Sequence, residues 1–546
     1  MRRTTRTRRP GAALTVAAGL VVAVLAACGA DEPAADTGDQ GVTVEALDNV
    51  FGEEEPHTVR VDVGGTVTWE NIGRNVHNVI SVDGAPFGVG EAEFTPGETY
   101  EATFDEEGAF AYYCSLHGNA TDGMVGTVLV GDVEAPPPPE PAPAALDIRA
   151  SGTTREVPAD HETIQAAVDA SEVGDLILIS PGVYEEAVQV PADKDGITLR
   201  GLDRDEVVLD GGFNLANGVQ VVGADGVVIE NMTARNYTRN GFFWTGVSGY
   251  RGSYLTAVRN GDYGVYAFES TQGQIEHSYG GGSPDAGFYI GGCQPCDAVI
   301  TDVVSEWNGL GYSGTNAGGD LVIAASTWRY NRAGIVPNSG SYEPDYPQDE
   351  STIVGNLVHD NNNGETPAID ISITAMGNGI LVAGGINNTI ERNRVIDHDV
   401  TGIGVITYPE SAEYLWEATG NVVRDNVVSG SGLGDIGLWF DGEGTATGEN
   451  CFSGNDFETS APEGLEDEAP CPAVAEGDLT RGALDIGALA VTDGRPASVP
   501  YEDADLPDIA EEDRPEMPDP ATSPARPAID VPFAVDLDAI EVPAAP

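Results

Sequence analysis

One stretch of the sequence decides the fold of the N-terminal region: residues 112–130 read YYCSLHGNATDGMVGTVLV. Short runs around it alternate apolar and polar residues, a pattern typical of strands with one buried face. A Gly-Gly pair at 64–65 marks a turn between two of these runs. We therefore expect a small all-β sandwich over 41–133. Its strands are expected at 57–63, 66–69, 100–104, 109–114 and 126–130.

Residues 112–130 resemble the late ligand segment of the plastocyanin and pseudoazurin family of type 1 copper proteins. The upstream sequence NVHNV at 75–79 resembles the early histidine loop of the same family. The framework segments GGTVTWEN at 64–71 and PGET at 96–99 match as well. The resemblance implies a cupredoxin domain that holds one copper ion.

The resemblance also implies the ligand set. His77, Cys114 and His117 correspond to the equatorial ligands and Met124 to the axial ligand, while Asn78 ties the two ligand loops together. Thiolate and thioether sulfur suit Cu(I), and imidazole suits both oxidation states. Six residues separate His117 from Met124, more than is common in plastocyanins, so the reduction potential stays open. A degenerate domain with a buried free cysteine is the alternative.

A glycine repeat dominates the region from 146 to 455. The first six of its glycines step by 23 or 24 residues, with short apolar strands between them, and this spacing predicts a parallel β-helix. A leucine-rich repeat would need a comb of leucines, and leucine is sparse here. The short amphipathic helix expected at 164–170 resembles the cap of pectate-lyase-like β-helices, which implies a right-handed coil. The repeated glycines are Gly218, Gly241, Gly264, Gly287, Gly311 and Gly334, and later Gly379, Gly404 and Gly437.

Catalytic residues in the β-helix cannot be identified from the sequence. The nearest candidates are His359-Asp360, Asp397-His398-Asp399 and Asp435 with Asp441. All lie at turns, where such residues are common for backbone reasons. Six aromatic residues are expected to stack inside the coils, with a sugar-binding groove as the alternative: Tyr237, Phe243, Trp244, Tyr266, Tyr289 and Tyr312.

The N-terminal residues resemble a bacterial lipoprotein signal. Arginines are followed by a short apolar run and then by the sequence LAAC, which ends at Cys28. The resemblance implies a signal peptide over 1–28, lipid on Cys28 and a flexible tether over 29–40. An ordinary secretory signal or an uncleaved anchor is the alternative, and every interpretation places the chain outside the cytoplasm.

Proline marks the other boundaries. A Pro-rich linker is expected at 134–145, and an acidic tail rich in Pro and Ala at 456–546. The tail is expected to be partly disordered or laid on the solenoid as an extended strap. In an oxidising compartment the remaining cysteines favour two local disulfides, Cys293–Cys296 and Cys451–Cys471.

The formal net charge of −64 excludes nucleic acid as a partner. It is typical of a soluble acidic protein outside the cell and equally of a protein from a saline habitat. We expect an extracytoplasmic one-electron carrier rather than an enzyme, with the β-helix as a scaffold or a recognition surface for a polysaccharide or cell-wall ligand. The redox partner stays unknown. Copper delivery to an oxidoreductase and a lyase- or epimerase-type enzyme acting on a polysaccharide are the alternatives.

Overall fold

The computed structural model describes residues 41–52, 57–135, 148–411, 414–439, 449–472, 494–525 and 535–546. The expected signal peptide, the lipidation of Cys28, the tether and most of the Pro-rich linker lie outside these residues. None of the helices within the described ranges has the length and apolar character that crossing a membrane requires.

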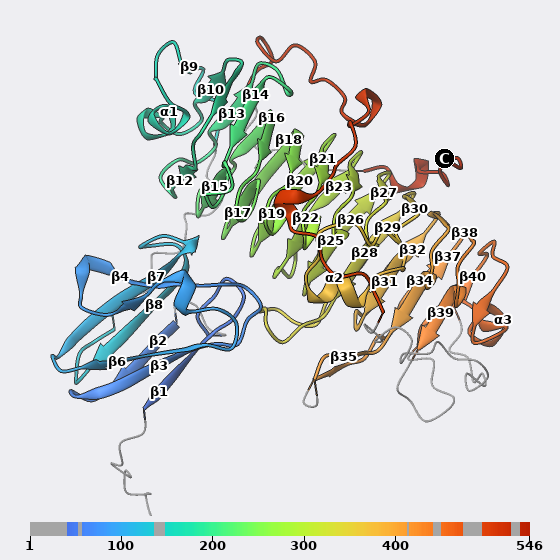
Figure 1. The fold of residues 1–546 in the computed structure, drawn as a ribbon, viewed down its shortest axis with the longest axis horizontal. Helices are drawn as coiled ribbons and strands as arrows, with labels where there is room; N and C mark the ends of the chain where they lie inside the picture. Colours follow the sequence, from blue (N-terminus) through green and yellow to red (C-terminus); the bar gives the residue numbers. More distant parts are fainter. Residues whose placement is uncertain are drawn as a thin grey trace, which may run out of the picture. The chain divides into compact units, whose positions relative to one another are not determined.

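Residues 42–52 and 57–130 form a sandwich of two β-sheets (Figure 1). Alternate residues of the strands point inward and bury an aromatic core around Trp69, which contacts Tyr100 and Tyr112. The first sheet has the order β1 (Val42–Ala46), β3 (Gly65–Asn71), β6 (Thr99–Phe104). The second has the order β2 (His57–Val61), β8 (Gly123–Val130), β7 (Gly108–Gly118), β4 (Val79–Ser81), β5 (Gly88–Val89).

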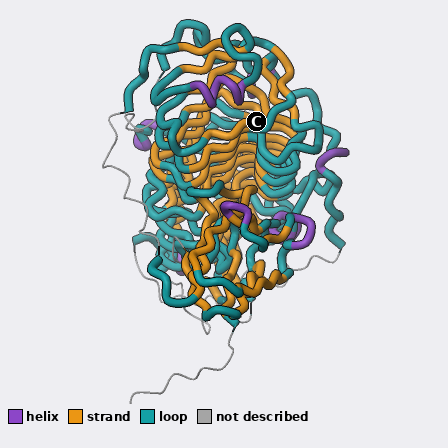
Figure 2. Tube along the Cα trace, turned by 90° about the vertical axis from the view of Figure 1, so that its left-hand side faces the viewer, coloured by secondary structure: helices purple, strands orange, loops and turns teal. Residues whose placement is uncertain are grey.

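The repeat region is a parallel β-helix, whose strands stack coil upon coil (Figure 2). In its 11-stranded sheet Val219 pairs with Phe242, and Phe242 with Val265, in the 23-residue register of the glycines. These residues point into the interior and are fully buried. The strands are β12 (Val188–Val190), β15 (Val219–Val222), β17 (Phe242–Thr245), β19 (Tyr263–Phe268), β22 (Ala286–Gly291), β25 (Leu310–Thr315), β28 (Ala333–Asn338), β31 (Ile380–Ala383), β34 (Thr401–Ile406), β39 (Gly434–Trp439) and β41 (Ser460–Ala461).

Two further rows of parallel strands complete each coil. The long strands β16 and β18 belong to both rows. One row contains β9 (Thr154–Val157), β10 (Leu176–Ile179), β13 (Thr198–Gly201), β16 (Val228–Arg235), β18 (Ser248–Val258), β20 (Thr271–Glu276), β23 (Val299–Thr301), β26 (Leu321–Ala324), β29 (Ser351–Val354), β32 (Thr389–Glu391), β37 (Val422–Arg424) and β40 (Cys451–Ser453). The other adds β11 (Gly182–Tyr184), β14 (Val207–Asp210), β21 (Tyr279–Gly281), β24 (Val304–Glu306), β27 (Thr327–Arg329), β30 (Leu357–His359), β33 (Arg394–Ile396) and β38 (Val427–Ser429).

Short helices cover the two ends of the β-helix core. At the N-terminal end, helix α1 (Ile164–Ala170) begins after Thr163, whose side chain accepts the N–H of Ala166. It buries Ile164, Ala167 and Val168 in the core of the coils. At the other end, α3 (Leu465–Glu468) buries Leu465 in the same core. Because a solenoid exposes its apolar interior at both ends, such caps protect it from solvent.

Two disulfides join Cys293 to Cys296 and Cys451 to Cys471. The second lies at the last coil, where β41 (Ser460–Ala461) pairs with β39. The regular sheet therefore continues past residue 455. A β-hairpin of β35 (Tyr408–Pro409) and β36 (Leu415–Trp416), and helix α2 (Asp370–Thr374), extend from the later coils.

Residues 494–525 of the tail cross the β-helix as an extended segment, which we call the C-terminal strap (Figure 1). Arginines of the coils hold it through its backbone carbonyls. Arg332 donates to Pro496 and Ala497, and Arg200 donates to Ser523 and Pro524. Arginine suits this role because its planar guanidinium has five fixed donors.

Buried asparagines stack along the corners of the coils. In one ladder the side-chain oxygen of Asn393 accepts both the backbone and the side-chain N–H of Asn356, at 2.9 and 3.0 Å. Asn393 in turn donates to Asn426, and Asn426 to Asn455. Each side-chain amide thus accepts a backbone N–H of the preceding coil, which is buried and would otherwise lack a hydrogen-bond partner.

Replacing Asn393 by alanine should therefore destabilise the β-helix. The change leaves a buried N–H of Asn356 without an acceptor, which costs about 2–4 kcal/mol when further bonds of the same side chain are lost. A denaturation midpoint measured by circular dichroism checks this. The exposed Asn214 provides the control, because Asn214→Ala should change stability by less than about 0.5 kcal/mol. Equal losses in the two variants would contradict the role of the ladder.

Candidate metal centre

Three side chains of the sandwich, those of His77, Cys114 and His117, meet at one end of the two sheets, and Met124 is buried in the core of the same sandwich. His77 lies on the loop between β3 and β4, and its backbone N–H donates to the carbonyl of Phe94 at 3.2 Å. Cys114 and His117 lie near the end of the long strand β7, and Met124 follows at the start of β8. The turn between β7 and β8 brings the last three residues together, whereas His77 comes from a distant part of the chain.

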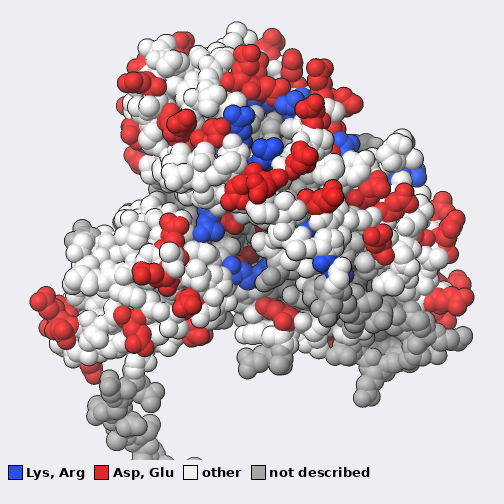
Figure 3. Space-filling view, in the orientation of Figure 1, with Lys and Arg blue, Asp and Glu red and all other residues white. Residues whose placement is uncertain are grey.

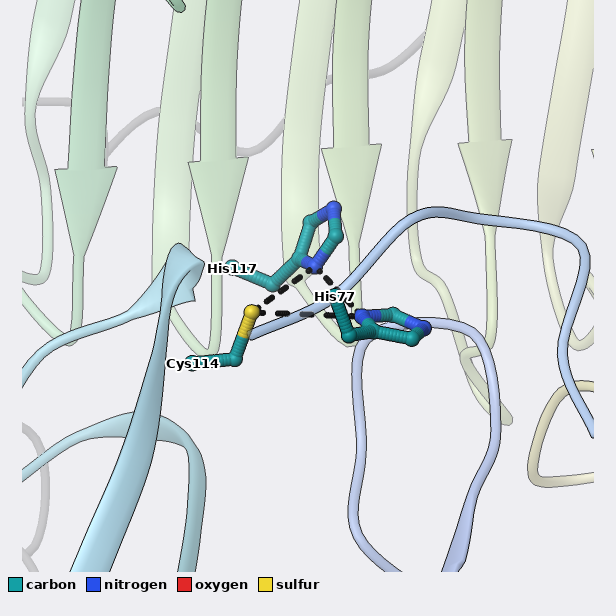
Figure 4. A group of neighbouring side chains, drawn as sticks. All are labelled: His77, Cys114 and His117. Carbon is teal, nitrogen blue, oxygen red and sulfur yellow. Dashed lines mark hydrogen bonds between the residues drawn. The ribbon is translucent and has the colours of Figure 1, made fainter. Parts of the chain in front are cut away.

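The two histidines and the cysteine point toward a common centre (Figure 4). The Nδ1 atoms of His77 and His117 are 3.1 Å apart, and the Sγ atom of Cys114 lies 3.9 and 3.6 Å from them. His77 and Cys114 are fully buried and His117 is 4% exposed. Among the described residues this is the single group of three or more His, Cys, Asp or Glu side chains with metal-ligand spacing.

Burial decides the protonation of these donors. It lowers the pKa of His77 to about 3 and the pKa of His117 well below its ordinary value. It also raises the pKa of the Cys114 thiol to about 11. The imidazoles are therefore neutral, as metal binding requires, but the thiol must lose its proton when a metal binds.

The donor set fits a copper ion. Cys114 is a free cysteine in a domain without disulfides among its described residues. The Met124 side chain is fully buried in the core of the same sandwich. Two imidazoles, one thiol and one thioether are the ligands of trigonal blue-copper sites with a weak axial bond.

Asn78 joins the two segments that carry the donors. Its Nδ2 donates to the hydroxyl of Ser115 and its Oδ1 accepts the N–H of Ser115, each at 2.9 Å. The backbone N–H of Asn78 points to the sulfur of Cys114 at 3.5 Å. These bonds hold the His77 loop against β7 without a metal. Asn78 therefore joins the two ligand segments, as expected from the sequence.

Residues of the β-helix that no sequence motif indicated also contact the ligand segments. Gln220 donates from Nε2 to the carbonyl of Leu116 at 3.2 Å. Arg74, on the His77 loop, donates to the hydroxyl of Tyr342 at 2.7 Å and its guanidinium stacks over the same ring. These pairs are 104 and 268 residues apart, so no local pattern in the sequence could reveal them.

The six aromatic residues divide between two environments. Tyr237, Trp244 and Tyr312 lie in the interior of the coils. Phe243, Tyr266 and Tyr289 lie on the outer side of the 11-stranded sheet, buried in a cluster with Leu47 and Val50 of the sandwich. The expectation of an interior position is therefore wrong for the second group, because neighbouring residues of a strand point to opposite faces.

The polar candidates of the β-helix lie on stacked turns of neighbouring coils, and their hydrogen bonds connect these turns. The imidazole of His359 pairs with the adjacent Asp360 at 2.8 Å. His398 is buried beside Asn361. The carboxylate of Asp435 accepts backbone N–H groups of neighbouring turns, and Asp441 lies outside the described residues. These contacts have a structural role in the coils.

Copper loading should depend on pH with a slope of one proton. Because the Cys114 pKa of about 11 lies above neutrality and the His77 pKa of about 3 lies below it, binding displaces only the thiol proton. The apparent affinity should rise about tenfold per pH unit between about pH 5 and about pH 8. Competition with a chelator of known affinity measures it. A slope of two would contradict the neutral state of both imidazoles.

Asn78→Ala should loosen the site. The loss of the two bonds to Ser115 should cost about 2 kcal/mol of stability in the copper-free protein, and copper should dissociate faster. Thermal unfolding with and without copper checks this. Asn78→Asp keeps the acceptor for the Ser115 N–H and should recover part of the loss, whereas wild-type behaviour of the alanine variant would refute the role of Asn78.

The β-helix resembles solved structures in its fold alone. The A-module of mannuronan C-5 epimerase AlgE4 from Azotobacter vinelandii is 15% identical in sequence, covers 55% of this chain and 93% of its own, and superposes with a TM-score of 0.37.

The sandwich matches known sequences more specifically. Residues 43–131 match the model of the copper binding proteins of the plastocyanin/azurin family. Halocyanin from Natronomonas pharaonis is 40% identical over 94 residues, which are 17% of this chain and 56% of the halocyanin, so the chain spans about half of that relative. Plastocyanin from Scenedesmus fuscus is 37% identical over 84 residues, 14% of this chain and 84% of the plastocyanin. Through its sandwich domain, the chain belongs to the plastocyanin/azurin family of copper-binding proteins.

Proposed function

We propose that the protein is a one-electron carrier that works outside the cytoplasm, with a type 1 copper held by His77, Cys114, His117 and Met124. The observation that carries the proposal is the convergence of the two Nδ1 atoms and the Sγ atom within 4.8 Å in a buried, apolar end of the sandwich. A copper ion bound there supplies a single-electron redox couple.

The residues around the donors support electron transfer rather than catalysis. Asn78 and the strands β7 and β8 hold the donors in place without the metal. Because rigid ligands move little between oxidation states, little reorganisation accompanies a change of charge. His77 and Cys114 are fully buried, which favours electron transfer through the protein surface over binding of a substrate at the metal.

The location outside the cytoplasm rests on two features. The signal-like N-terminus, with Cys28 as its lipidation site, would attach the chain to the outer face of the cell membrane. The disulfides Cys293–Cys296 and Cys451–Cys471 form readily in an oxidising compartment. For the β-helix we propose a scaffold role or recognition of a cell-wall polysaccharide, since the hydrogen bonds of its polar candidates serve the turns of the coils.

The visible absorption spectrum of the full chain loaded with Cu(II) tests the function. Wild type should show the intense copper–thiolate charge-transfer band, and Cys114→Ser should lose it. Met124→Leu should keep the band and shift the reduction potential, because it removes only the weak axial ligand. Reversible voltammetry should accompany the band.

Two results would overturn the proposal. Bound copper without the charge-transfer band in wild type would indicate a storage or delivery site, and transfer of that copper to an apo-oxidoreductase would establish delivery. A band that survives in Cys114→Ser would place the copper elsewhere. The exposed Glu101 on β6 gives a control, because Glu101→Gln should leave the spectrum unchanged.

A further inference from the structure

A pocket lies beside the His77 loop, where the sandwich meets the 11-stranded sheet. It has a volume of about 410 Å³, within the usual range for small-molecule sites. Ile72 and Arg74 of the sandwich contribute to its wall. The coils contribute outward side chains of consecutive strands, of helix α2 and of the β35 hairpin, among them Val336, Ile371, Leu381, Ala383, Ile406 and Tyr408.

The wall of the pocket is mainly apolar. Val336, Leu381 and Ile406 point away from the coil interior and belong to the outer apolar cluster. The one acidic side chain of the wall, Glu410, already accepts hydrogen bonds from Ser341 and from the indole of Trp416 at 2.7 Å. The acid is therefore satisfied by the protein itself and does not call for a cationic ligand.

Arg74 is the cationic group of this wall. Its Nη1 donates to the Tyr342 hydroxyl, and among the described residues no carboxylate lies within ion-pairing distance of its guanidinium. The side chain is half-buried, so the remaining donors border the pocket. Burial alone would lower the pKa of Arg74, but Tyr342, Asp285 and Asp48 raise it above its ordinary value, so the group stays charged.

We propose that this pocket binds a small organic carboxylate with an apolar body. The carboxylate would accept hydrogen bonds from the free donors of Arg74, which match it in charge and planar geometry. The apolar body would pack against Leu381 and Ile406. A uronic acid is a poorer match, because its hydroxyl groups would lose water against these apolar side chains without finding partners.

Arg74 is one of few basic side chains in a strongly acidic protein. Acidic side chains are spread over the face in Figure 3 and basic ones are few. The net charge of −64 repels anions at long range. Affinity for a carboxylate must therefore come from close contact, and binding should be measured at a fixed ionic strength that screens the long-range field.

Calorimetric titration of the full chain with benzoate, benzamide and glucuronate tests the proposal. Benzoate should bind at one site, and benzamide, its uncharged analogue, at least about tenfold more weakly, because a charge-assisted hydrogen bond is lost. Glucuronate should also bind more weakly than benzoate. The copper-free protein serves for this experiment, so the outcome is separate from that of the proposed electron transfer.

Two variants locate the site. Arg74→Gln removes the charge and should weaken benzoate binding at least about tenfold. Ala383→Leu fills the pocket from the β-helix side, leaves Arg74 intact and should weaken binding as well. Arg60→Gln on β2 is the matched control, because Arg60 donates to the carbonyls of Gly131 and Val133 away from the pocket. It should bind benzoate like wild type.

Several results would overturn the proposal. These are the absence of saturable benzoate binding, equal affinities for benzoate and benzamide, or binding that is unchanged in both Arg74→Gln and Ala383→Leu. Tighter binding of glucuronate would replace it with a uronic acid site. If Arg74→Gln does not fold, as judged by circular dichroism, Ala383→Leu alone decides.

Discussion

The carboxylate of Asp48 holds the loop on which both sites depend. It accepts the backbone N–H groups of Arg74 and Asn75 at 2.5 and 2.8 Å. The loop reaches His77 two residues later, while the Arg74 side chain extends to Tyr342. The N–H of Asp48 itself donates to the carbonyl of Tyr342 at 2.7 Å. Burial raises the pKa of Asp48 to about 6, although the charge of Arg74 opposes this. One buried acid thus positions the loop that carries both His77, a candidate copper ligand, and Arg74, the cationic group of the proposed carboxylate pocket.

The metal centre shows why its donors must be arranged before the metal arrives. An apolar environment disfavours a free thiolate and a protonated imidazole alike. The same environment keeps competing water and protons away from Cys114 and His117 once a cation balances the sulfur. Burying these polar groups in the copper-free protein costs free energy, which the interactions of strands β7 and β8 and of Asn78 must offset.

Much of this architecture could be predicted from the sequence because its signals are local or periodic. The glycine step of about 23 residues reappears as the register that pairs Val219 with Phe242, and the segment 112–130 contains three of the four candidate donors. A period of two cannot say which face of a strand is the inner one, so Phe243 and Trp244 could not be separated. Contacts between distant segments, such as Arg74 with Tyr342, leave no trace in the local pattern.

The C-terminal strap changes how the β-helix should respond to force. A solenoid in which each coil contacts only its neighbours can peel from one end, coil by coil. The strap connects Arg200 with residues 523 and 524, and Arg332 with residues 496 and 497. A load applied along the coil axis is therefore shared between the sheets and the strap in parallel. The coils between these two anchor points should therefore unfold together, rather than one coil at a time.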